Sequence, residues 1–480
     1  MKTVSGKVSP CTPRVDIELT FVKAQGGVGE DVYYRKVMNP KTGQLTQKRY
    51  YVRQKSNNPD YVCWLTSVKL KPTELGTAIA EYEADCPMRP NVFIHTEKGV
   101  EEVIDGNYGF AKKQYKFIDL FAGIGGFHTA MHSVGGKCVF ASEWDKYARI
   151  SYEANYKTIE PNLFEKDKDG NYLYFNEDIN DAVPSNIPNF DICCGGFPCQ
   201  PFSVAGLKRG FDDTRGTLFF NIANIIKEKI DAGYPPRVLF LENVRGLKNH
   251  DKGQTLKVIL ATLEELGYGY SYEVLNAKYF GVPQNRERLF IIAWYKELVK
   301  VETFKFPYGI AADGSTIYEK AKVKEGTLPT KVSDIFEPEE TLDVKFTISD
   351  GLWEGHQRRK ERNKLNGKGF GYSLFNKDSV YTSTISARYW KDGSEILIDQ
   401  SEKGLNPRKL TPVEAGRLQG YRILGNGWQN PECANNQNYN DSNPEFKIVV
   451  SNKEAYHQFG NSVAIPVIKR LAEEIVKQLM

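Results

Sequence analysis

Short apolar runs recur between residues 115 and 300, and each leads into a polar or glycine-containing turn. The runs are Phe117–Phe121, Cys138–Ser142, Asp191–Cys194, Val238–Leu241 and Leu289–Trp294. Runs this short and this continuously apolar are typical of strands that are buried on both faces of a sheet. A helical stretch begins at about Phe127, between the first two runs. The alternation predicts an α/β fold with an open, largely parallel sheet.

The residues before and after this region have different patterns. Near the N-terminus, Val32–Met38 and Leu45–Val52 flank the turn-like segment Asn39–Gly43, which predicts a β-hairpin. From about residue 300 the alternation stops, and the chain becomes richer in charge, Gly and Lys. Near the end, the polar tract Asn426–Asn443 predicts a loop, and Ile465–Leu479 predicts an amphipathic helix. We therefore divide the chain into residues 1–114, 115–299, 300–408 and 409–480.

Composition limits the class of protein. At 480 residues the chain is long for one domain, so two or three are expected. No apolar stretch reaches the roughly 18 residues that span a bilayer, and Met1–Arg14 has no apolar core of a secretory signal; we expect a cytoplasmic protein. The eight cysteines include no CxxC pair, which favours free thiols and gives no reason to expect a metal. The net charge of +4 is too small to indicate nucleic-acid binding by itself.

A glycine-rich turn follows the first apolar run, in Asp119–Gly126. Glycines there let a ligand approach the backbone at the end of a strand. His128 stands where a dinucleotide fingerprint has its third glycine, which weakens a nicotinamide or flavin interpretation. Glu143 follows the next run and can hold ribose hydroxyls, and Trp144 offers a face for adenine. With Asp178 after a third candidate strand, the pattern predicts a nucleoside site, although such glycines often serve packing alone.

One cysteine stands in a rigid loop, Gly195-Gly-Phe-Pro-Cys-Gln-Pro-Phe-Ser203. The prolines beside Cys199 cannot continue a central strand, and a rigid loop at a strand end is a typical way to present a nucleophile. A lone thiol is more often a buried structural cysteine. Cys193 and Cys194, inside the apolar run, fit that alternative. Cys199 is therefore the candidate nucleophile.

Two charged segments accompany the later strands. Glu242, in Leu241-Glu-Asn-Val244, is a carboxylate at a strand end that can act as a general acid beside a thiol. In Gln284-Asn-Arg-Glu-Arg288, strand alternation would place Gln284, Arg286 and Arg288 on one face. Arginines so placed can bind a phosphate or a base oxygen. A solvated charged edge is the alternative for this segment taken alone.

In combination and in this order, the segments resemble DNA cytosine-5 methyltransferases of the bacterial restriction–modification type. The resemblance includes Arg408-Lys-Leu-Thr-Pro-Val-Glu-Ala-Gly-Arg-Leu-Gln-Gly420 and Gln458-Phe-Gly-Asn-Ser-Val463. It implies a Rossmann-like, S-adenosylmethionine-dependent methyltransferase sheet in residues 115–299. Residues 409–480 would return to this catalytic domain and close the donor pocket. Residues 300–408 would be a smaller target-recognition region, and residues 1–114 an N-terminal extension of unknown role.

The resemblance also implies roles for single residues. Cys199 would attack carbon 6 of the target cytosine, Glu242 would be the acid at ring nitrogen N3, and Arg286 and Arg288 would clamp the base and a nearby phosphate. The donor pocket would consist of Phe121, Gly123, Gly125, Glu143, Trp144, Asp178, Ile179, Asn461 and Ser462. The loop positions that would approach DNA are Gln200 and Ser203.

Residues 300–408 would select the DNA sequence. Gly367–Tyr372 and Thr384–Ile398 resemble bacterial relatives that modify sites beginning CC. A local basic cluster, opposed only by Glu361, suits phosphate contacts, although such clusters are commonly just solvated. The DNA-binding candidates in this region are Arg358, Arg359, Arg362, Lys368 and Thr384.

The chemistry of this reaction needs the residue types that the sequence contains. Carbon 5 of cytosine is too weak a nucleophile to attack a sulfonium methyl group until a thiolate adds at carbon 6 and N3 is protonated. The base is stacked in a duplex, so it should be flipped out. Expected partners are double-stranded DNA, S-adenosylmethionine and a companion restriction endonuclease, with no metal and no membrane. The alternatives are a tRNA cytosine-5 methyltransferase, disfavoured by the large recognition region, and a catalytically inactive DNA-binding regulator, disfavoured by the intact Cys199, Glu242 and Arg288.

Overall fold

The computed structural model describes residues 115–198, 218–423 and 445–480, together with the backbone of six strands nearer the N-terminus. The chain forms two compact units, Met1–Gln114 and Tyr115–Met480. The first unit contains an antiparallel sheet in which neighbouring strands follow each other along the chain. Its strands are β1 Leu19–Val22, β2 Asp31–Met38, β3 Leu45–Gln54, β4 Val62–Thr66, β5 Val92–Thr96 and β6 Gly99–Val103. Met38 pairs with Leu45, which confirms the predicted hairpin.

The second unit is built on a seven-stranded sheet with the order β12-β13-β11-β10-β7-β8-β9. Its strands are β7 Tyr115–Leu120, β8 Gly136–Ser142, β9 Phe175–Asn176, β10 Ile192–Gly196, β11 Val238–Val244, β12 Tyr268–Asn276 and β13 Glu287–Tyr295. The strands from β9 across to β11 pair in parallel, whereas β13 is antiparallel to both of its neighbours. All five predicted strands are present, and β12, which joins the sheet at one edge, was missed.

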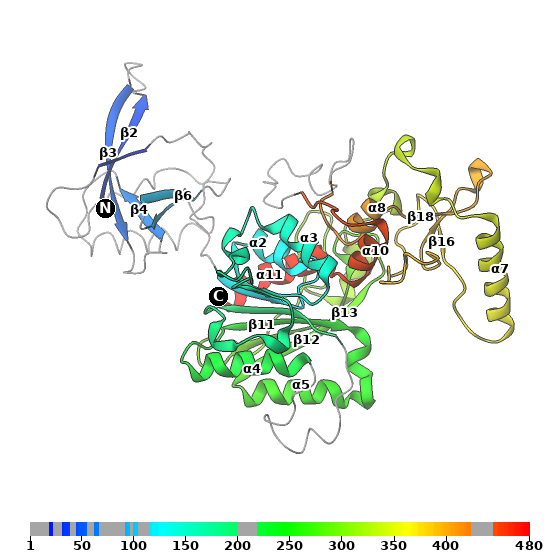
Figure 1. Cartoon of the computed structure of the whole chain (residues 1–480), viewed down its shortest axis with the longest axis horizontal. Coiled ribbons are helices and arrows are strands. Elements are labelled where there is room, and N and C mark those ends of the chain that lie inside the picture. Colours follow the sequence, from blue (N-terminus) through cyan, green and yellow to red (C-terminus); the bar gives the residue numbers. More distant parts are fainter. Residues whose placement is uncertain are drawn as a thin grey trace. The chain divides into compact units, whose positions relative to one another are not determined.

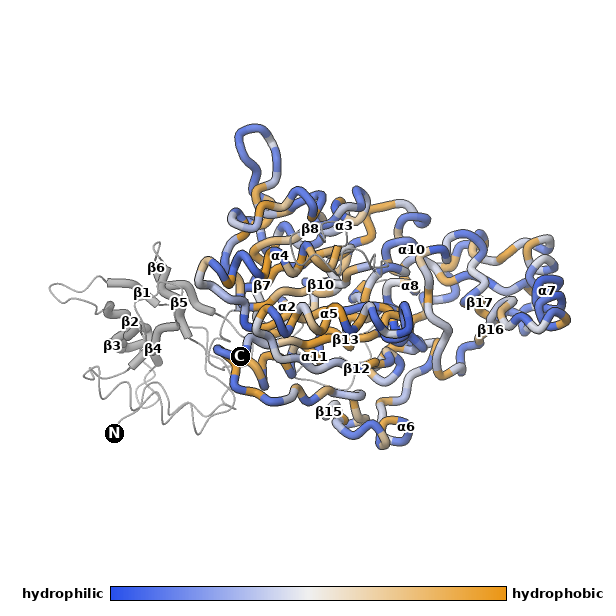
Figure 2. The backbone as a smooth tube through the Cα atoms, turned by 90° about the horizontal axis from the view of Figure 1, so that it is seen from below, coloured by the Kyte–Doolittle hydropathy of each residue, from blue (hydrophilic) through white to orange (hydrophobic). Residues whose placement is uncertain are grey.

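Helices cover both faces of this sheet (Figure 1). On one face lie α2 Gly126–Ser133, α3 Lys146–Tyr156 and the C-terminal α11 Ile465–Leu479, which share a buried core with the sheet. On the other face lie α4 Leu218–Asp231 and α5 Gln254–Glu265. The bounds of α11 are those that the apolar stripe predicted, and the stripe is buried. In Figure 2 the hydrophobic residues concentrate along the strands, as burial on two faces requires.

Residues 300–408 have a different construction. Each of their strands is two residues long: β14 Gly309–Ile310, β15 Thr316–Ile317, β16 Leu374–Phe375, β17 Leu397–Ile398 and β18 Arg408–Lys409. Their helices include α6 Val323–Gly326 and the longer α7 Asp350–Leu365, which lies at the end of the unit away from the large sheet (Figure 1). A third core joins Ile385, Tyr389 and Ile396 to α8 Pro412–Leu418 and α10 Asn452–Asn461.

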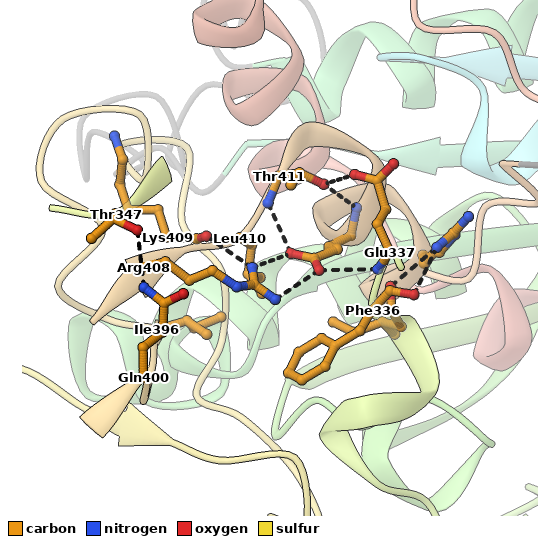
Figure 3. Close-up of polar contacts among 12 residues, drawn as sticks. Phe336, Glu337, Thr347, Ile396, Gln400, Arg408, Lys409, Leu410 and Thr411 are labelled. Carbon is orange, nitrogen blue, oxygen red and sulfur yellow. Dashed lines mark hydrogen bonds and ion pairs between the residues drawn. The ribbon is translucent and has the colours of Figure 1, made fainter. Parts of the chain in front are cut away.

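A buried ion pair stands where residues 300–408 meet the return segment. The Arg408 guanidinium donates to both carboxylate oxygens of Glu414, at 2.7 and 2.9 Å. The same carboxylate accepts the backbone N–H groups of Thr411 and Glu337. Figure 3 shows Arg408, Thr411 and Glu337 converging at this contact. A bidentate pair of this kind fixes geometry as well as charge, so it sets how the two segments meet.

Candidate active site

Three neighbouring strand ends bring the predicted donor residues to one edge of the sheet. β7 leads into the glycine-rich turn, β8 leads into Glu143 and Trp144, and β9 is followed by Asp178 and Ile179. Backbone hydrogen bonds tie the three ends together, because Ala122 N–H donates to Ser142 and Glu143 N–H donates to Asn176. The carboxyl edge of a parallel sheet is the usual ligand site of such folds.

The glycine-rich turn takes a backbone conformation that side chains disfavour. Phe121, Gly123 and Gly125 have φ values of 56°, 56° and 84°. A Cβ on Gly125 would lie 2.2 Å from the Tyr156 ring, whereas one on Gly123 would meet nothing within 4 Å. Gly125 is therefore required by packing, and the open space beside Gly123 leaves room for a ligand. A left-handed conformation at the non-glycine Phe121 costs energy and is typical of functional turns.

Glu143 supports the turn from the next strand end. Its carboxylate accepts the N–H groups of Gly123 and Asp145, both at 2.7 Å. Burial raises the pKa of Glu143, and the two backbone donors oppose this shift. The adjacent Trp144 side chain is 79% exposed, so its face is free to stack on an adenine ring. These contacts fit a nucleoside with its ribose near Glu143.

The remaining predicted donor residues follow β9 at the same edge of the sheet or lie at the end of α10. Asp178 accepts the backbone N–H of Asn180, and Ile179 is buried. Ser462, at the end of α10, exchanges a hydrogen bond with the Tyr421 hydroxyl at 2.7 Å, and its Oγ would lie 3.2 Å from a Cβ on Gly126. Asn461 is exposed. The return segment thus packs directly against the glycine-rich turn.

A second cluster of functional groups gathers where β10 and β11 end side by side. The parallel register places Gly196 opposite Glu242. The Asn243 side chain donates to the Phe197 carbonyl at 2.8 Å. This bond anchors the chain two residues before Cys199, so the loop leaves its strand beside the Glu242 carboxylate. Asn243 was not singled out from the sequence, although it stands next to Glu242 in the same segment.

Glu242 pairs with Arg288 from the neighbouring strand. Arg288 lies opposite Val244 in the β11–β13 register, and its Nε is 3.0 Å from Glu242 Oε1. Burial raises the pKa of Glu242, opposed by the charges of Arg288 and Arg286. A buried carboxyl group with a raised pKa keeps its proton more readily near neutral pH, as a general acid requires.

The candidate nucleophile lies outside the described residues, as do the loop positions Gln200 and Ser203. The two cysteines that precede it are described and are fully buried in β10. Burial raises the pKa of both thiols, which disfavours their reactive thiolate forms. The prediction that Cys193 and Cys194 are structural is therefore confirmed.

Strand β13 begins at Glu287, so Gln284 and Arg286 precede the strand on which alternation was expected to place them, and both are buried. Arg286 donates to the backbone carbonyls of Ile385, Gly460 and Ser462. Arg286 interacts with Glu242 through the electrostatic attraction of their charges, whereas Arg288 contacts the Glu242 carboxylate directly.

The DNA-binding candidates in residues 300–408 differ in the exposure of their side chains and in the groups that those side chains contact. Arg358, Arg362 and Lys368 are exposed, but Arg358 pairs with Glu354 at 3.2 Å, so Glu361 is not the only opposing acid. Arg359 turns inward, donating to the Gly371 carbonyl and to Asp392. The Thr384 hydroxyl donates to the backbone carbonyl of Asn285, the residue before Arg286, at 2.6 Å.

A buried carboxyl group beneath the turn was missed. Asp119, in β7, accepts the Tyr152 hydroxyl at 3.2 Å through one carboxylate oxygen, and its other oxygen is buried without a hydrogen-bond partner among the described residues. Burial raises the pKa of this carboxyl group. His128 also shares a hydrogen bond with Tyr152 at 2.7 Å. Within the described residues no cluster of three or more acidic, His or Cys side chains could hold a metal ion, and no helix there is long and apolar enough to cross a membrane.

The fold is that of known methyltransferases. A solved structure of a Spodoptera frugiperda DNMT2 variant has a TM-score of 0.52 at 19% identity, covering 75% of this chain and 99% of that one. A solved structure of the S. pombe Dnmt2 methyltransferase has a TM-score of 0.51 at 17% identity, covering 76% of this chain and 98% of that one. The sheet order and these likenesses define an α/β methyltransferase fold.

The sequence places the chain within one family of that fold. The profile of C-5 cytosine-specific DNA methylases matches residues 115–422 and 428–477. Type II methyltransferase M.SsoII from Shigella sonnei is 48% identical over 368 residues, which are 76% of this chain and 81% of the relative. The chain belongs to the C-5 cytosine-specific DNA methylase family and is a DNA cytosine-5 methyltransferase. The resemblance inferred from the motifs is confirmed.

Proposed function

We propose that this enzyme methylates carbon 5 of a flipped cytosine within a short site of double-stranded DNA, with Cys199 as nucleophile, Glu242 as acid and Arg288 as its partner at the base. The observation that carries the proposal is the strand-end cluster. Gly196 lies opposite Glu242, Asn243 anchors the loop before Cys199, and Arg288 contacts Glu242 at 3.0 Å. In this proposal the Cys199 thiol acts beside this acid and this cation.

The residues perform the reaction in a fixed order. The Cys199 thiolate forms a bond to carbon 6 while Glu242 gives its proton to N3, and the ring becomes an enamine with a nucleophilic carbon 5. Carbon 5 takes the methyl group and then loses its proton to a base. Return of the N3 proton to Glu242 accompanies expulsion of the thiolate. Arg288 holds Glu242 in place and can contact the exposed edge of the base.

The donor in this proposal is S-adenosylmethionine, which supplies an electrophilic methyl group when bound. Trp144 would stack on its adenine, Glu143 and Asp178 would hold polar groups of the nucleoside, and the turn at Gly123 would leave room beside the backbone. The return segment, with Asn461 and Ser462, would close the pocket. The open space at Gly123 and the exposed Trp144 ring support this fit.

In this proposal residues 300–408 select the DNA site, which begins CC, and residues 1–114 are not required for chemistry. Arg358, Arg362 and Lys368 are exposed for phosphate contacts, while Thr384 positions the loop of Arg286. The named relatives are Type II methyltransferases, which supports a protective role beside a companion restriction endonuclease. Type II methyltransferase M.NlaX from Neisseria lactamica matches 75% of this chain with 96% of its own length at 47% identity.

Bisulfite sequencing of DNA from cells expressing the protein tests this function. We expect protected cytosines at one short site, and none when the same cells express Cys199→Ser, because a hydroxyl is a far weaker nucleophile than a thiolate. The same treatment of cellular tRNA forms the second arm. Protection confined to tRNA would replace DNA as the substrate, and protection in neither nucleic acid would indicate an inactive regulator.

A further inference from the structure

The buried guanidinium of Arg286 lies where three segments of the chain meet. It donates to the Ile385 carbonyl at 3.3 Å, to the Gly460 carbonyl at 3.3 Å and to the Ser462 carbonyl at 2.5 Å. Ile385 belongs to the recognition region, and the other two residues end α10 beside the donor pocket. Only 3% of Arg286 is exposed, so its two terminal nitrogens face these carbonyls and not solvent, while its Nε is buried without a hydrogen-bond partner among the described residues.

Further contacts make this junction specific. The Gln284 side chain accepts the Ile385 N–H at 3.1 Å, and Arg286 donates to the Ile385 carbonyl. Both backbone polar groups of Ile385 are therefore hydrogen-bonded to this segment. A Cβ on Gly460 would lie 2.3 Å from the Ser386 carbonyl group, so the two backbones touch without a side chain between them. Beyond Arg286, Ser462 packs on Gly126 of the glycine-rich turn. A continuous set of contacts therefore joins the recognition region to the donor turn.

Among the described residues no carboxylate contacts the Arg286 guanidinium, and backbone carbonyl dipoles balance its charge. Burial lowers its pKa to about 9, with the nearby charge of Arg288 adding to the shift and Glu242 opposing it. A buried cation tolerates this environment only while its hydrogen bonds are made. The junction is thus sensitive to displacement of any one of the three segments, and it lies beside the acid of the reaction.

We propose that Arg286 is a positioning residue that couples donor binding to DNA binding, by holding the recognition region and the donor-pocket segment to the strand that carries Arg288. The proposal rests on the proposed function in taking S-adenosylmethionine and site-containing DNA as the two ligands. In this role Arg286 contacts no base. Donor binding fixes the positions of Gly460 and Ser462. Through its hydrogen bonds to their carbonyls and to that of Ile385, Arg286 then holds the recognition region in the arrangement that binds DNA.

The coupling is measured as the Kd of one ligand alone divided by its Kd in the presence of the other ligand. This ratio must be the same for both ligands. Fluorescence anisotropy would give the Kd of a duplex carrying the methylated site, without and with saturating S-adenosylhomocysteine. Calorimetry would give the Kd of S-adenosylhomocysteine with and without the duplex. For the unmodified protein we expect the ratio to lie in the range of about 5–150 that is typical of coupled sites.

Arg286→Lys keeps the charge but carries its donors on one nitrogen, which cannot reach three segments as the planar guanidinium does. We expect the ratio to fall to within about twofold of one, with weaker binding of each ligand. Arg288→Lys is the matched control, and it should lower kcat while the ratio stays as in the unmodified protein. Gln284→Met removes the second bond to Ile385 without changing a charge and should lower the ratio too, so it decides the matter if Arg286→Lys does not fold.

A ratio of one in the unmodified protein would overturn the proposal. So would an unchanged ratio in Arg286→Lys, or in Gln284→Met where the first variant does not fold. Loss of kcat in Arg286→Lys with both affinities and the ratio intact would assign Arg286 to the base instead. Failure of the proposed function is a different result, since it would appear as an unmodified protein that leaves DNA unmethylated.

Discussion

The strands of the large sheet bury apolar side chains on both faces, whereas residues 300–408 contain strands of two residues and add buried polar contacts to the small apolar core at their border. In the sheet, Ile192, Leu239 and Phe240 are fully buried. At the border of the recognition region the buried groups include Arg408, Glu414 and Arg286, all charged. Apolar packing tolerates small changes by repacking, but a buried charge that loses its partner has no substitute.

This difference indicates how the two regions divide the work. The sheet is a rigid support that presents functional groups at strand ends without needing them for its own stability. Residues 300–408 are held by the apolar core that joins Ile385, Tyr389 and Ile396 to α8 and α10, and also by buried polar groups at their border. Substitutions at functional positions should therefore change the reaction rate in the first region, and folding or affinity in the second.

The largest effect is expected at the acid. Glu242→Gln should lower kcat by about 10²–10⁴-fold, because an amide cannot protonate N3. Burial raises the pKa of Glu242, and in the proposed mechanism the protonated form is the active one, so the unmodified enzyme should lose activity as pH rises through that pKa. The variant should lack this limb of the pH profile. Single-turnover methylation across pH measures both.

Glu287→Gln is the matched control for this variant. Glu287 adjoins Arg288 but pairs with the exposed Arg245, and exposed pairs contribute little. We expect its rate and pH profile to stay close to those of the unmodified enzyme. A Glu242→Gln protein that kept the rate and the pH limb would show that the acid is another group.

The next effect is on folding of the recognition region. Arg408→Met leaves the Glu414 carboxylate buried without its cation, which typically costs about 3–5 kcal/mol. Lys403→Met removes an exposed partner of Glu339 and should change the free energy of unfolding little, because exposed ion pairs contribute little. Urea unfolding of both variants measures the contrast. Equal costs for the two would contradict the idea that buried polar contacts hold this region.

The contrast between apolar strands and polar junctions also explains which parts of the molecule could be predicted from the sequence. The strands of the sheet, α11 and the Glu242 segment were predictable because apolar runs and motifs are local signals. Strand β12 was missed because it lies at the sheet edge and only three of its nine residues are buried, which leaves no continuous apolar run. Its partner β13 was expected in a largely parallel sheet, but strand direction has no local signal.

The polar junctions could not be predicted from local pattern. The carbonyls that Arg286 binds lie 99 to 176 residues further along the chain. Likewise, nothing in the run of arginines distinguishes the inward Arg359 from the outward Arg358, because Gly371 and Asp392 decide the matter. A side chain bonded to a distant backbone carbonyl leaves no periodicity in the sequence.

The smallest expected effect concerns the exposed side of α7. Arg358→Ala combined with Arg362→Ala should weaken DNA binding and reduce the slope of log affinity against log salt by roughly 0.9 for each lost phosphate contact. The Arg358 pair with Glu354 is exposed and therefore holds the side chain only weakly. Anisotropy titrations at several salt concentrations measure the slope, and the preferred site should not change.

Arg359→Ala is the internal comparison, since it lies in the same helix but faces the other way. Its loss removes the bonds to Gly371 and Asp392, so we expect a lower unfolding temperature and an unchanged salt slope. The two variants should thus separate affinity from stability within a few residues of one helix. If the double variant left the slope unaltered while Arg359→Ala reduced it, the DNA would lie against the opposite side of α7, and the outward arginines would be a solvated surface.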